Sequence, residues 1–406
     1  MDETERQKIK DILSRGVEKI YPDKKSLEER LASGAKIKLY CGYDPSGPSL
    51  HLGHMITLKK LSQFQKLGHK VIMLMGDFTG MIGDPTDKSA ARKKLTREEV
   101  LKNSVNYKKL ASKFLDFSGE NPVEILYNSQ WSDKLNFGDL IELASNFTVQ
   151  QMITREMFQQ RLKNKKPIYL HEFLYPLAQA YDSVAMDVDL EIGGNDQIFN
   201  MLCGRELMRV VKNKEKLVLA LKLLTDPQGK KMGKSEGNMV ELDEEPKQMF
   251  GKIMSWPDEL IVPGMDLLTD IPSPEIDKIK EDMQSGKINP RDAKAQLARE
   301  IITVCHNKDS AILAEKEFEK IFKEKELPSE IEEYEYAKLR LPGEGAPIID
   351  SVTQIGLTKS KSEAKRLIIQ GGLKIDGIVE KDWRKIIKIK KGQVFQGGKR
   401  KFKKII

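Results

Sequence analysis

The chain has 406 residues, of which 39% are hydrophobic and 32% charged, and its formal net charge at pH 7 is +8. At roughly 150 residues per domain, this length predicts about two to four domains. No run of about 20 apolar residues occurs, so we expect no membrane span, and the acidic N-terminal stretch does not have the pattern of a secretory signal. The three cysteines are far apart and odd in number. We therefore expect neither a disulfide framework nor a CxxC-type zinc site, and we expect a cytoplasmic protein.

The positive charge is concentrated at the C-terminal end of the chain. Residues 347–406 contain 16 Lys and Arg against 5 Asp and Glu, whereas the remainder contains 53 against 56. This segment is not of low complexity and has apolar periodicity. It therefore indicates a basic module that binds nucleic acid, although a solvated, solubilising tail is the alternative.

Residues 37–75 predict a strand, a crossover helix and a second strand. Ile37–Cys41 is a short strand candidate, and the helix after it has one apolar stripe and ends at Gly68. Val71–Met75 is fully apolar, as in a strand buried within a parallel sheet. We therefore predict an α/β fold with a doubly wound, parallel, Rossmann-like catalytic domain.

The rest of the chain predicts further domains. A glycine-rich loop that becomes basic occupies residues 76–95, Met186–Ile192 is a strand candidate, and a helix is expected over 198–211. The predicted organisation is a catalytic domain over 1–240 with a mainly helical insertion at about 97–180, an α-helical domain over 241–325, an acidic linker over 326–346, and a small α+β domain over 347–406.

The motif His51-Leu-Gly-His54 opens the helix that follows the first predicted strand. A helix N-terminus has free N–H groups and a partial positive charge, which favour phosphate, and two imidazoles there can donate hydrogen bonds to a phosphoryl group. Gly53 leaves room for a flat base to approach the backbone. An ordinary pair of surface histidines is the alternative, whereas a metal site would need a third ligand at a supportive spacing.

A second motif, Lys230-Lys-Met-Gly-Lys-Ser235, forms a cationic segment far downstream. Lys231 and Lys234 are three residues apart, so the loop can close on a triphosphate and neutralise charge that moves onto pyrophosphate. The order of residues is not that of a Walker A loop. A solvated charge run is the alternative, which the histidine motif upstream makes much less plausible.

Two further patterns indicate a polar pocket. Tyr175, Gln179 and Asp182 have the spacing i, i+4, i+7 and share one face of an otherwise apolar helix, which suits a pocket floor or, alternatively, a solvent-facing side. The run Gly193-Gly-Asn-Asp-Gln197 places glycines, an acid and an amide at the end of a strand. This is the ligand-binding edge of a doubly wound sheet, with a capped turn as the alternative.

Together these motifs resemble a class I aminoacyl-tRNA synthetase, and more closely the bacterial-type tyrosyl-tRNA synthetases. HLGH and KMGKS resemble the family's HIGH and KMSKS motifs, with Gly233 in place of the usual serine. The resemblance also includes Tyr40-Cys-Gly-Tyr-Asp-Pro45 and Gly83-Asp-Pro85, and it covers nearly the whole chain. It implies activation of tyrosine with ATP and Mg²⁺, transfer of the tyrosyl group to the 3′ end of tRNA(Tyr), and a homodimer with its interface in the insertion.

The resemblance implies a role for individual residues. Tyrosine is expected to bind through Tyr40 and Asp182 at its hydroxyl, Asp84, Tyr175 and Gln179 at its α-ammonium, and Gln197 at its carboxyl group. Contacts with ATP are expected from Asp44, Gly53, Gly194, Asp196 and Met232. Catalytic groups facing the phosphates are expected to be His51, His54, Lys231, Lys234, Lys88 and Arg92. No metal ligand is expected, and Glu191, where some relatives have Gln, is given no role.

Residues 347–406 resemble an S4 RNA-binding domain, a pattern that ribosomal proteins and pseudouridine synthases share. A basic helix over Ser360–Gln370 has Lys361, Lys365 and Arg366 on or near one face. Such a helix binds RNA backbone with an affinity that falls with salt. The expected partners are therefore tRNA, tyrosine, ATP and a second copy of the chain, but neither DNA nor a membrane.

The predicted pocket explains why tyrosine is the expected substrate. Phenylalanine would leave the buried groups of Tyr40 and Asp182 without a partner hydroxyl, which is unfavourable. Tyrosyl-tRNA synthetases are themselves the familiar example of such rejection, so its size is not inferred from this sequence. The alternatives are a tryptophanyl relative, a non-catalytic RNA-binding protein with a synthetase-like shell, and a free-standing adenylyltransferase.

Overall fold

The structure is a computed structural model that describes residues 3–84, 95–225, 239–322, 331–339, 345–398 and 401–406. By the contacts between residues it divides into two compact units. The first comprises Met1–Glu245 and Lys252–Asn307, and the second comprises Pro246–Gly251 and Lys308–Ile406.

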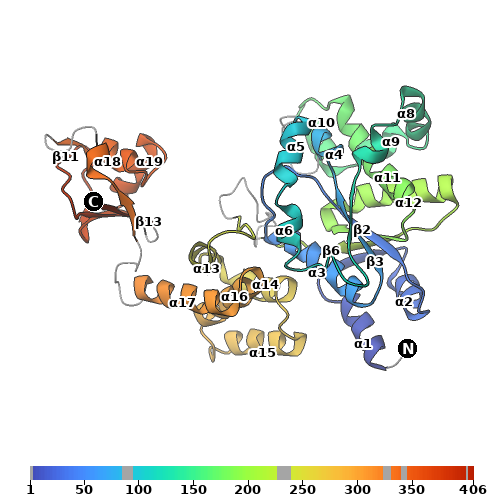
Figure 1. Ribbon diagram of the computed structural model, residues 1–406, viewed down its shortest axis with the longest axis horizontal. Coiled ribbons are helices and arrows are strands. Elements are labelled where there is room, and N and C mark those ends of the chain that lie inside the picture. The colour runs from blue at the N-terminus through green and yellow to red at the C-terminus, as the bar shows by residue number, and fades with distance from the viewer. Residues whose placement is uncertain (1–2, 85–94, 226–238, 323–330, 340–344, 399–400) are drawn as a thin grey trace. The chain divides into compact units, whose positions relative to one another are not determined.

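A six-stranded sheet forms the centre of the first unit (Figure 1). In spatial order its strands are β1 (Val17–Tyr21), β6 (Leu217–Leu221), β5 (Leu190–Gly194), β2 (Lys38–Tyr43), β3 (Lys70–Met75) and β4 (Glu124–Tyr127). β1 and β6 pair antiparallel, and the other neighbours pair parallel. The direction of winding reverses between β2 and β5, which confirms the predicted doubly wound α/β fold and puts a crevice at the carboxyl ends of these two strands.

Helices connect and cover the strands of this sheet. They are α1 (Glu3–Ile12), α2 (Lys24–Ala32), α3 (Leu52–Lys66), α4 (Thr79–Ile82), α5 (Arg97–Ser104), α6 (Tyr107–Ala111), α7 (Ser129–Ser132), α8 (Phe137–Ala144), α9 (Val149–Ile153), α10 (Glu156–Lys163), η2 (Leu170–Phe173), α11 (Leu174–Met186), η3 (Asn195–Gln197) and α12 (Ile198–Lys212). The helices α11 and α12, which precede and follow β5 in the chain, pack side by side (Figure 1).

The crossover helix α3 forms as the apolar stripe predicts. Met55, Leu58, Leu61 and Phe64 are all fully buried, and each such side chain contributes about 1.5–3 kcal/mol by leaving water. The helix ends just before Gly68, whose φ of 76° is a backbone conformation that glycine adopts without strain. The βαβ unit is therefore confirmed, with its strands at β2 and β3.

Two elements of the first unit differ from the sequence prediction. The segment 97–180, predicted as mainly helical, also contributes β4, which extends the sheet beside β3. β4 has four residues and only partial burial, so it lacks the long apolar run that marks a buried strand. The strand predicted from Met186 begins instead at Leu190, because α11 continues to Met186 and ends at Asp187 in the left-handed conformation.

The segment after the catalytic sheet is helical, as predicted for 246–325 within the described residues. It contains α13 (Pro246–Met254), η5 (Asp258–Leu260), α14 (Ile261–Leu268), α15 (Ser273–Gln284), α16 (Pro290–Cys305) and α17 (Lys308–Phe322). Proline at the first turn of α13, α15 and α16 suits the start of a helix, where its missing N–H has no partner to lose.

The C-terminal part of the second unit is a small α+β fold. Its five-stranded sheet has the order β10 (Ile378–Glu380), β9 (Leu373–Ile375), β12 (Val394–Gly397), β13 (Lys401–Ile405) and β7 (Glu332–Tyr334), and β8 (Ala346–Pro347) pairs with β11 (Ile386–Ile387). α18 (Ile348–Gln354), η6 (Tyr336–Lys338) and α19 (Lys361–Ile369) complete it.

Part of the predicted linker belongs to this small fold. β7 lies within the segment 326–346, yet it pairs in parallel with β13 at the other end of the chain. Tyr334 and Tyr336 also pack against the apolar core that includes Val352 and Phe395. The segment is acidic, and a strand of three residues has too few positions to show alternation. The sequence therefore did not reveal β7.

Candidate active site

A cavity of about 1280 Å³ lies at the carboxyl ends of β2 and β5, where the winding of the sheet reverses. Every predicted site residue of the catalytic domain that the structure describes lines it: Tyr40, Asp44, His51, Gly53, His54, Asp84, Tyr175, Gln179, Asp182, Gly194, Asp196 and Gln197. The predicted Lys88, Arg92, Lys231, Met232 and Lys234 lie outside the described residues.

His51 and His54 are held at the N-terminus of α3 by bonds to nearby backbone. His51 is the N-cap residue, and its Nδ1 accepts from the N–H of Gly53 at 3.1 Å. The Nδ1 of His54 accepts from the N–H of His51 at 3.1 Å, and the two rings are in contact, with centroids 3.9 Å apart and planes tilted by 33°. A neutral imidazole that accepts at Nδ1 carries its proton on Nε2. Each ring can therefore donate from Nε2 to an anionic oxygen.

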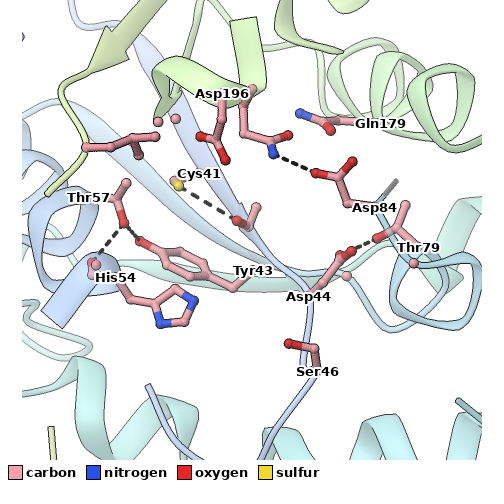
Figure 2. A pocket seen from close by; sticks show the side chains of 18 of the residues that line it. Cys41, Tyr43, Asp44, Ser46, His54, Thr57, Thr79, Asp84, Gln179 and Asp196 are labelled. Atoms are coloured by element: carbon pink, nitrogen blue, oxygen red, sulfur yellow. Dashed lines mark hydrogen bonds between the residues drawn. The ribbon is translucent and has the colours of Figure 1, made fainter. Parts of the chain in front are cut away.

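Burial keeps the second of these rings neutral. It lowers the pKa of His54 well below its usual value, and the neighbouring His51 acts in the same direction. Beside it, Tyr43 and Thr57 share a hydrogen bond of 2.9 Å, as Figure 2 shows. His54 therefore presents a neutral hydrogen-bond donor rather than a cation over the physiological pH range.

The structure gives a second reason for a glycine at position 53, besides the room for a flat base expected from the sequence. A Cβ atom at this position would lie 2.8 Å from Cε1 of His51, closer than side-chain atoms tolerate. The glycine therefore lets the imidazole of His51 fold back over the first turn of α3. A larger residue would displace the ring that caps the helix.

Asp44, immediately after β2, lies between two hydroxyl donors. Tyr175 donates to its Oδ2 at 2.8 Å and Thr79 donates to its Oδ1 at 2.6 Å. The bond to Thr79 is visible in Figure 2. Burial and the charge of Asp44 raise the pKa of Tyr175 well above its usual value, so this phenol remains a donor. The sequence motif placed Asp44 at the nucleotide and Tyr175 at the ammonium group, and the structure brings them into direct contact.

Asp84 also lines the cavity and accepts a hydrogen bond of 2.6 Å from Nε2 of Gln197. Its Oδ1 is 3.5 Å from Nη2 of Arg155, a buried residue that also lines the cavity. Gln197 in turn accepts from Asn200 at 2.9 Å. A carboxylate and an amide therefore lie side by side, which suits the ammonium and carboxyl groups of an amino acid.

Asp182 lines the cavity and is 2% exposed, and we call the buried part of the cavity around Asp182 and Tyr40 its closed end. Its Oδ1 accepts from Nε1 of Trp131 at 2.8 Å, and its Oδ2 accepts from Nδ2 of Asn128 at 3.2 Å. The amide of Asn128 is oriented by its own Oδ1, which accepts from the N–H of Phe78 at 2.8 Å. Burial raises the pKa of Asp182, and the two N–H donors act against that rise because they stabilise the carboxylate.

Tyr40 lies beside Asp182 and is 1% exposed. Its hydroxyl is 2.9 Å from Oγ of Ser183. Burial, with Glu191 and Asp182 nearby, raises the pKa of Tyr40 well above its usual value. The phenol is therefore protonated, and the closed end of the cavity offers one hydroxyl and one carboxyl group to a ligand.

Five residues that line this closed end or support it from behind were not predicted as site residues: Asn128, Trp131, Ser183, Glu191 and Lys216. Glu191 was noted only as a departure from relatives, yet it lines the cavity. Asn128 follows directly after β4, the strand that the sequence did not reveal. No spacing along the chain connects Lys216 with Glu191, which it contacts as a buried ion pair.

The predicted RNA-binding residues are exposed on or next to α19, which begins with Ser360 as its N-cap. Nζ of Lys361 is 2.9 Å from Oδ1 of Asp350. Nζ of Lys365 lies 4.0 Å from the centre of the Trp383 ring. Arg366 is also exposed, so a cationic face is available for phosphate contacts.

Two other kinds of site are absent from the described residues. Across the described ranges, no three His, Cys, Asp or Glu side chains are grouped so that they can hold a metal ion. None of the helices in the part of the chain that the structure describes is long and apolar enough to cross a membrane.

Comparison with known proteins relates the chain to one group of enzymes. A family model described as tRNA synthetases class I (W and Y) matches residues 32–323. The tyrosine–tRNA ligase of Carboxydothermus hydrogenoformans is 44% identical and covers 100% of this chain and 99% of its own length. That of Thermotoga maritima is 42% identical over 97% of this chain and 96% of its own.

Solved structures support the same fold. A C-terminally truncated mitochondrial tyrosyl-tRNA synthetase of Aspergillus nidulans has a TM-score of 0.65 at 22% identity and covers 78% of this chain and 94% of its own. The tyrosyl-tRNA synthetase of Archaeoglobus fulgidus in complex with L-tyrosine has a TM-score of 0.60 at 21% identity, with 76% and 99% covered.

Proposed function

Because the chain belongs to the tyrosyl-tRNA synthetase family of class I aminoacyl-tRNA synthetases, we propose that the cavity at β2 and β5 joins tyrosine to ATP and then to tRNA. The protein is a tyrosine–tRNA ligase that forms tyrosyl-adenylate and pyrophosphate and transfers the tyrosyl group to the 3′ end of tRNA(Tyr). One observation supports this assignment of the cavity above others: a histidine pair suited to phosphate and a buried carboxylate suited to a phenol line the same cavity.

The first step is an in-line displacement at phosphorus. A carboxylate oxygen of tyrosine forms a bond to the α-phosphorus of ATP, and the bond from that phosphorus to the bridging oxygen of pyrophosphate breaks. His51 and His54 donate from Nε2 to the phosphate oxygens as charge develops there. Lys231, Lys234, Lys88 and Arg92 are proposed to neutralise the leaving pyrophosphate. ATP enters as its magnesium complex, with the cation held mainly by phosphates and water.

The second step transfers the acyl group. A ribose hydroxyl at the 3′ end of tRNA attacks the acyl carbon of the adenylate, AMP leaves with the bonding electron pair, and the proton of the hydroxyl passes to a phosphate oxygen of AMP or to water. Neither step needs a nucleophilic side chain, so the cavity contributes position and charge stabilisation.

The remaining polar groups are assigned to the ends of the two small substrates. Tyr40 and Asp182 bind the phenolic hydroxyl, where both groups are buried. The α-ammonium is assigned to Asp84, Tyr175 and Gln179, and the carboxyl group to Gln197. Asp44, Gly53, Gly194, Asp196 and Met232 are assigned to the nucleotide. A Cβ at Gly194 would lie 2.4 Å from Oδ1 of Asp196, so the glycine permits the close position of that carboxylate.

Contacts with tRNA are assigned to the parts of the chain outside the catalytic domain. We assign 241–325 to the neighbourhood of the anticodon, and the S4-like module over 347–406 to further tRNA surface. Exposed Lys361, Lys365 and Arg366 supply phosphate contacts in that module.

A homodimer is proposed through the insertion at about 97–180. This segment carries several large apolar side chains that are exposed in the single chain: Val105, Phe137, Ile141, Val149 and Leu170. A protein interface typically covers exposed apolar groups, and these side chains are the candidates in this segment. The protein is assigned to the cytoplasm, where charged tRNA is consumed.

The direct test of the proposed chemistry is ATP–pyrophosphate exchange with each of the twenty amino acids in turn. Exchange with tyrosine alone is expected. Exchange with tryptophan instead would keep the fold and overturn the pocket assignment. No exchange with any amino acid, in folded protein with Mg²⁺, would favour an RNA-binding protein without catalysis, and exchange without any charging of tRNA would favour a free-standing adenylyltransferase.

A further inference from the structure

A buried ion pair at the closed end of the cavity has no part in the proposed chemistry: Glu191 lines the cavity, and its partner Lys216 is not among the lining residues. Lys216, which directly precedes β6, has a side chain that is 0% exposed, and it contacts Oε2 of Glu191 on β5. Burying two charges costs free energy that their attraction does not always return, and apolar residues can fill such a space at least as well. The pair is therefore weak evidence of stabilisation, and its other contacts indicate what it does.

These contacts extend from the pair to both ends of the tyrosine site. Nζ of Lys216 donates to Oγ of Ser183 at 2.9 Å, and that oxygen is 2.9 Å from the hydroxyl of Tyr40. On the other side, Nε2 of Gln179 donates to Oε1 of Glu191 at 2.9 Å. One buried pair thus joins the residue proposed for the phenol to a residue proposed for the ammonium group.

The chemistry of lysine gives this chain of bonds a direction. An ammonium group has three donors and no acceptor, so Ser183 must accept from Lys216. The hydroxyl hydrogen of Ser183 is then free to point at the oxygen of Tyr40, 2.9 Å away. In that order Tyr40 accepts from Ser183, and its own O–H is available to a ligand in the cavity, with Glu191 as the other acceptor near it.

The opposite order does not suit a phenol. If Tyr40 donated to Ser183, its oxygen would face the ligand as an acceptor beside the carboxylate of Asp182. A phenolic hydroxyl has a single proton and could satisfy only one of two acceptors. Burial raises the pKa of Asp182, but both of its oxygens accept N–H bonds, from Trp131 and Asn128, and these bonds act against that rise by stabilising the carboxylate as an acceptor.

We propose that Lys216, acting through Ser183, orients the hydroxyl of Tyr40 so that it donates to the phenolic oxygen of tyrosine while that phenol donates to Asp182. Lys216 is a positioning residue because it touches no substrate, and Glu191 holds it in place. The inference rests on the proposed function, since it presumes that the closed end binds the phenol. It predicts that tyrosine is preferred over phenylalanine partly through a residue behind the pocket wall.

The hydrogen bonds from Lys216 to Ser183 and from Ser183 to Tyr40 are here called the relay. The first test substitutes Ser183→Ala, which removes the hydroxyl in the middle of the relay and leaves the ion pair intact. In ATP–pyrophosphate exchange, kcat/KM for tyrosine is expected to fall about 5- to 20-fold, the effect of one net hydrogen bond. The value for phenylalanine is expected to change less than about 2-fold, because its ring has no hydroxyl to lose a bond. In a Tyr40→Phe background, Ser183→Ala is expected to cause no further loss of kcat/KM for tyrosine, because the hydroxyl that Ser183 orients is already absent.

A second variant tests Lys216 without leaving an unpaired buried charge. Lys216→Met combined with Glu191→Gln removes both charges and keeps an acceptor for Gln179. In this double variant, kcat/KM for tyrosine is expected to fall by the same factor as in Ser183→Ala. Adding Ser183→Ala to the double variant is expected to cause no further fall. Lys60→Met is the matched control, since Lys60 is 5% exposed and donates only to backbone carbonyls outside the cavity. It is expected to lower stability without changing the ratio of tyrosine to phenylalanine.

The outcomes separate the inference from the proposed function. Exchange by the unmodified protein tests the function, and absence of exchange with tyrosine would overturn both. With that exchange present, equal losses for tyrosine and phenylalanine in Ser183→Ala would indicate a structural role and overturn the relay. Unchanged kinetics with tyrosine, or fully additive losses in the combined variants, would overturn it as well.

Discussion

The two ends of the cavity are built in different ways. At the phosphate end, defined by His51 and His54, each ring is fixed by backbone N–H groups within the same four-residue motif. At the phenol end, defined by Tyr40 and Asp182, each group is fixed by side chains that come from distant parts of the chain. The phosphate end is therefore formed by contacts within one short segment, whereas the phenol end forms only when the sheet and its helices have assembled.

This difference has a consequence for substitutions. At the phosphate end the motif itself should matter most, because its own backbone N–H groups hold both rings. At the phenol end, residues that never touch tyrosine should also affect its selection, because low-dielectric surroundings make each unpaired group costly. The variants below test this contrast.

The largest effect is expected for Asp182→Ala. It removes the charged acceptor for the phenol and leaves the N–H groups of Trp131 and Asn128 without their buried partner. At about 1.5–3 kcal/mol for a charged hydrogen bond and a similar cost for stranded donors, kcat/KM for tyrosine is expected to fall by about 100-fold or more in exchange assays. Asp187→Asn, directly after the same helix, is the matched control and should leave kcat/KM for tyrosine nearly unchanged, because asparagine tolerates the left-handed backbone of this residue. Unchanged use of tyrosine by Asp182→Ala would refute the pocket.

A smaller loss, of a different kind, is expected at the other end. His51→Ala and His54→Ala remove donors that act on the developing charge, so kcat for adenylate formation is expected to fall about 10- to 100-fold. The KM for tyrosine should change little, because the phenol end remains intact. Stopped-flow or exchange kinetics would measure both constants, with His171→Ala as a control outside the cavity lining. Normal turnover in both histidine variants would contradict the phosphate-end assignment.

Substitutions outside both ends should leave adenylate formation unaffected. The double change Lys365→Ala with Arg366→Ala removes two exposed cations of α19, and KM for tRNA in charging assays is expected to rise about 10-fold. The dependence of tRNA binding on salt should weaken because fewer counterions are released. Exchange with tyrosine should be unchanged, and Lys25→Ala in the catalytic domain is the control. Equal losses in exchange and charging would indicate a folding role for this module.

The smallest effect is expected for Trp131→Phe, which tests support of Asp182 from behind. The ring is kept while the donor to Oδ1 of Asp182 is lost, so kcat/KM for tyrosine should fall about 5-fold. KM for ATP should not change. A loss that affects ATP and tyrosine alike would show that the two ends are less independent than their contacts indicate.

The contrast between the ends also explains which features the sequence could predict. The histidine motif, the βαβ unit and the doubly wound sheet follow from short patterns, and the described motif residues lie in one cavity because strand ends and helix starts meet at one edge of such a sheet. The polar face of Tyr175, Gln179 and Asp182 was predicted from helical spacing alone. In these cases local pattern and global fold carry the same information.

The features that were missed depend on pairing between distant segments. Glu191 was given no role because its partner, Lys216, is 25 residues away and shares no pattern with it. Asn128 depends on β4, a four-residue strand in a segment that is otherwise helical. β7 was taken for linker because its partner strand β13 lies 71 residues further along the chain. Such pairs are fixed by packing, which sequence spacing does not encode.

The most direct test of the account is a crystal structure of the protein with L-tyrosine and a non-hydrolysable ATP analogue. The phenolic oxygen is expected within hydrogen-bond distance of both Tyr40 and Asp182, with the phosphates against Nε2 of His51 and His54. A phenol that lies away from Asp182, or phosphates bound at the closed end of the cavity, would contradict the assignment of the two ends.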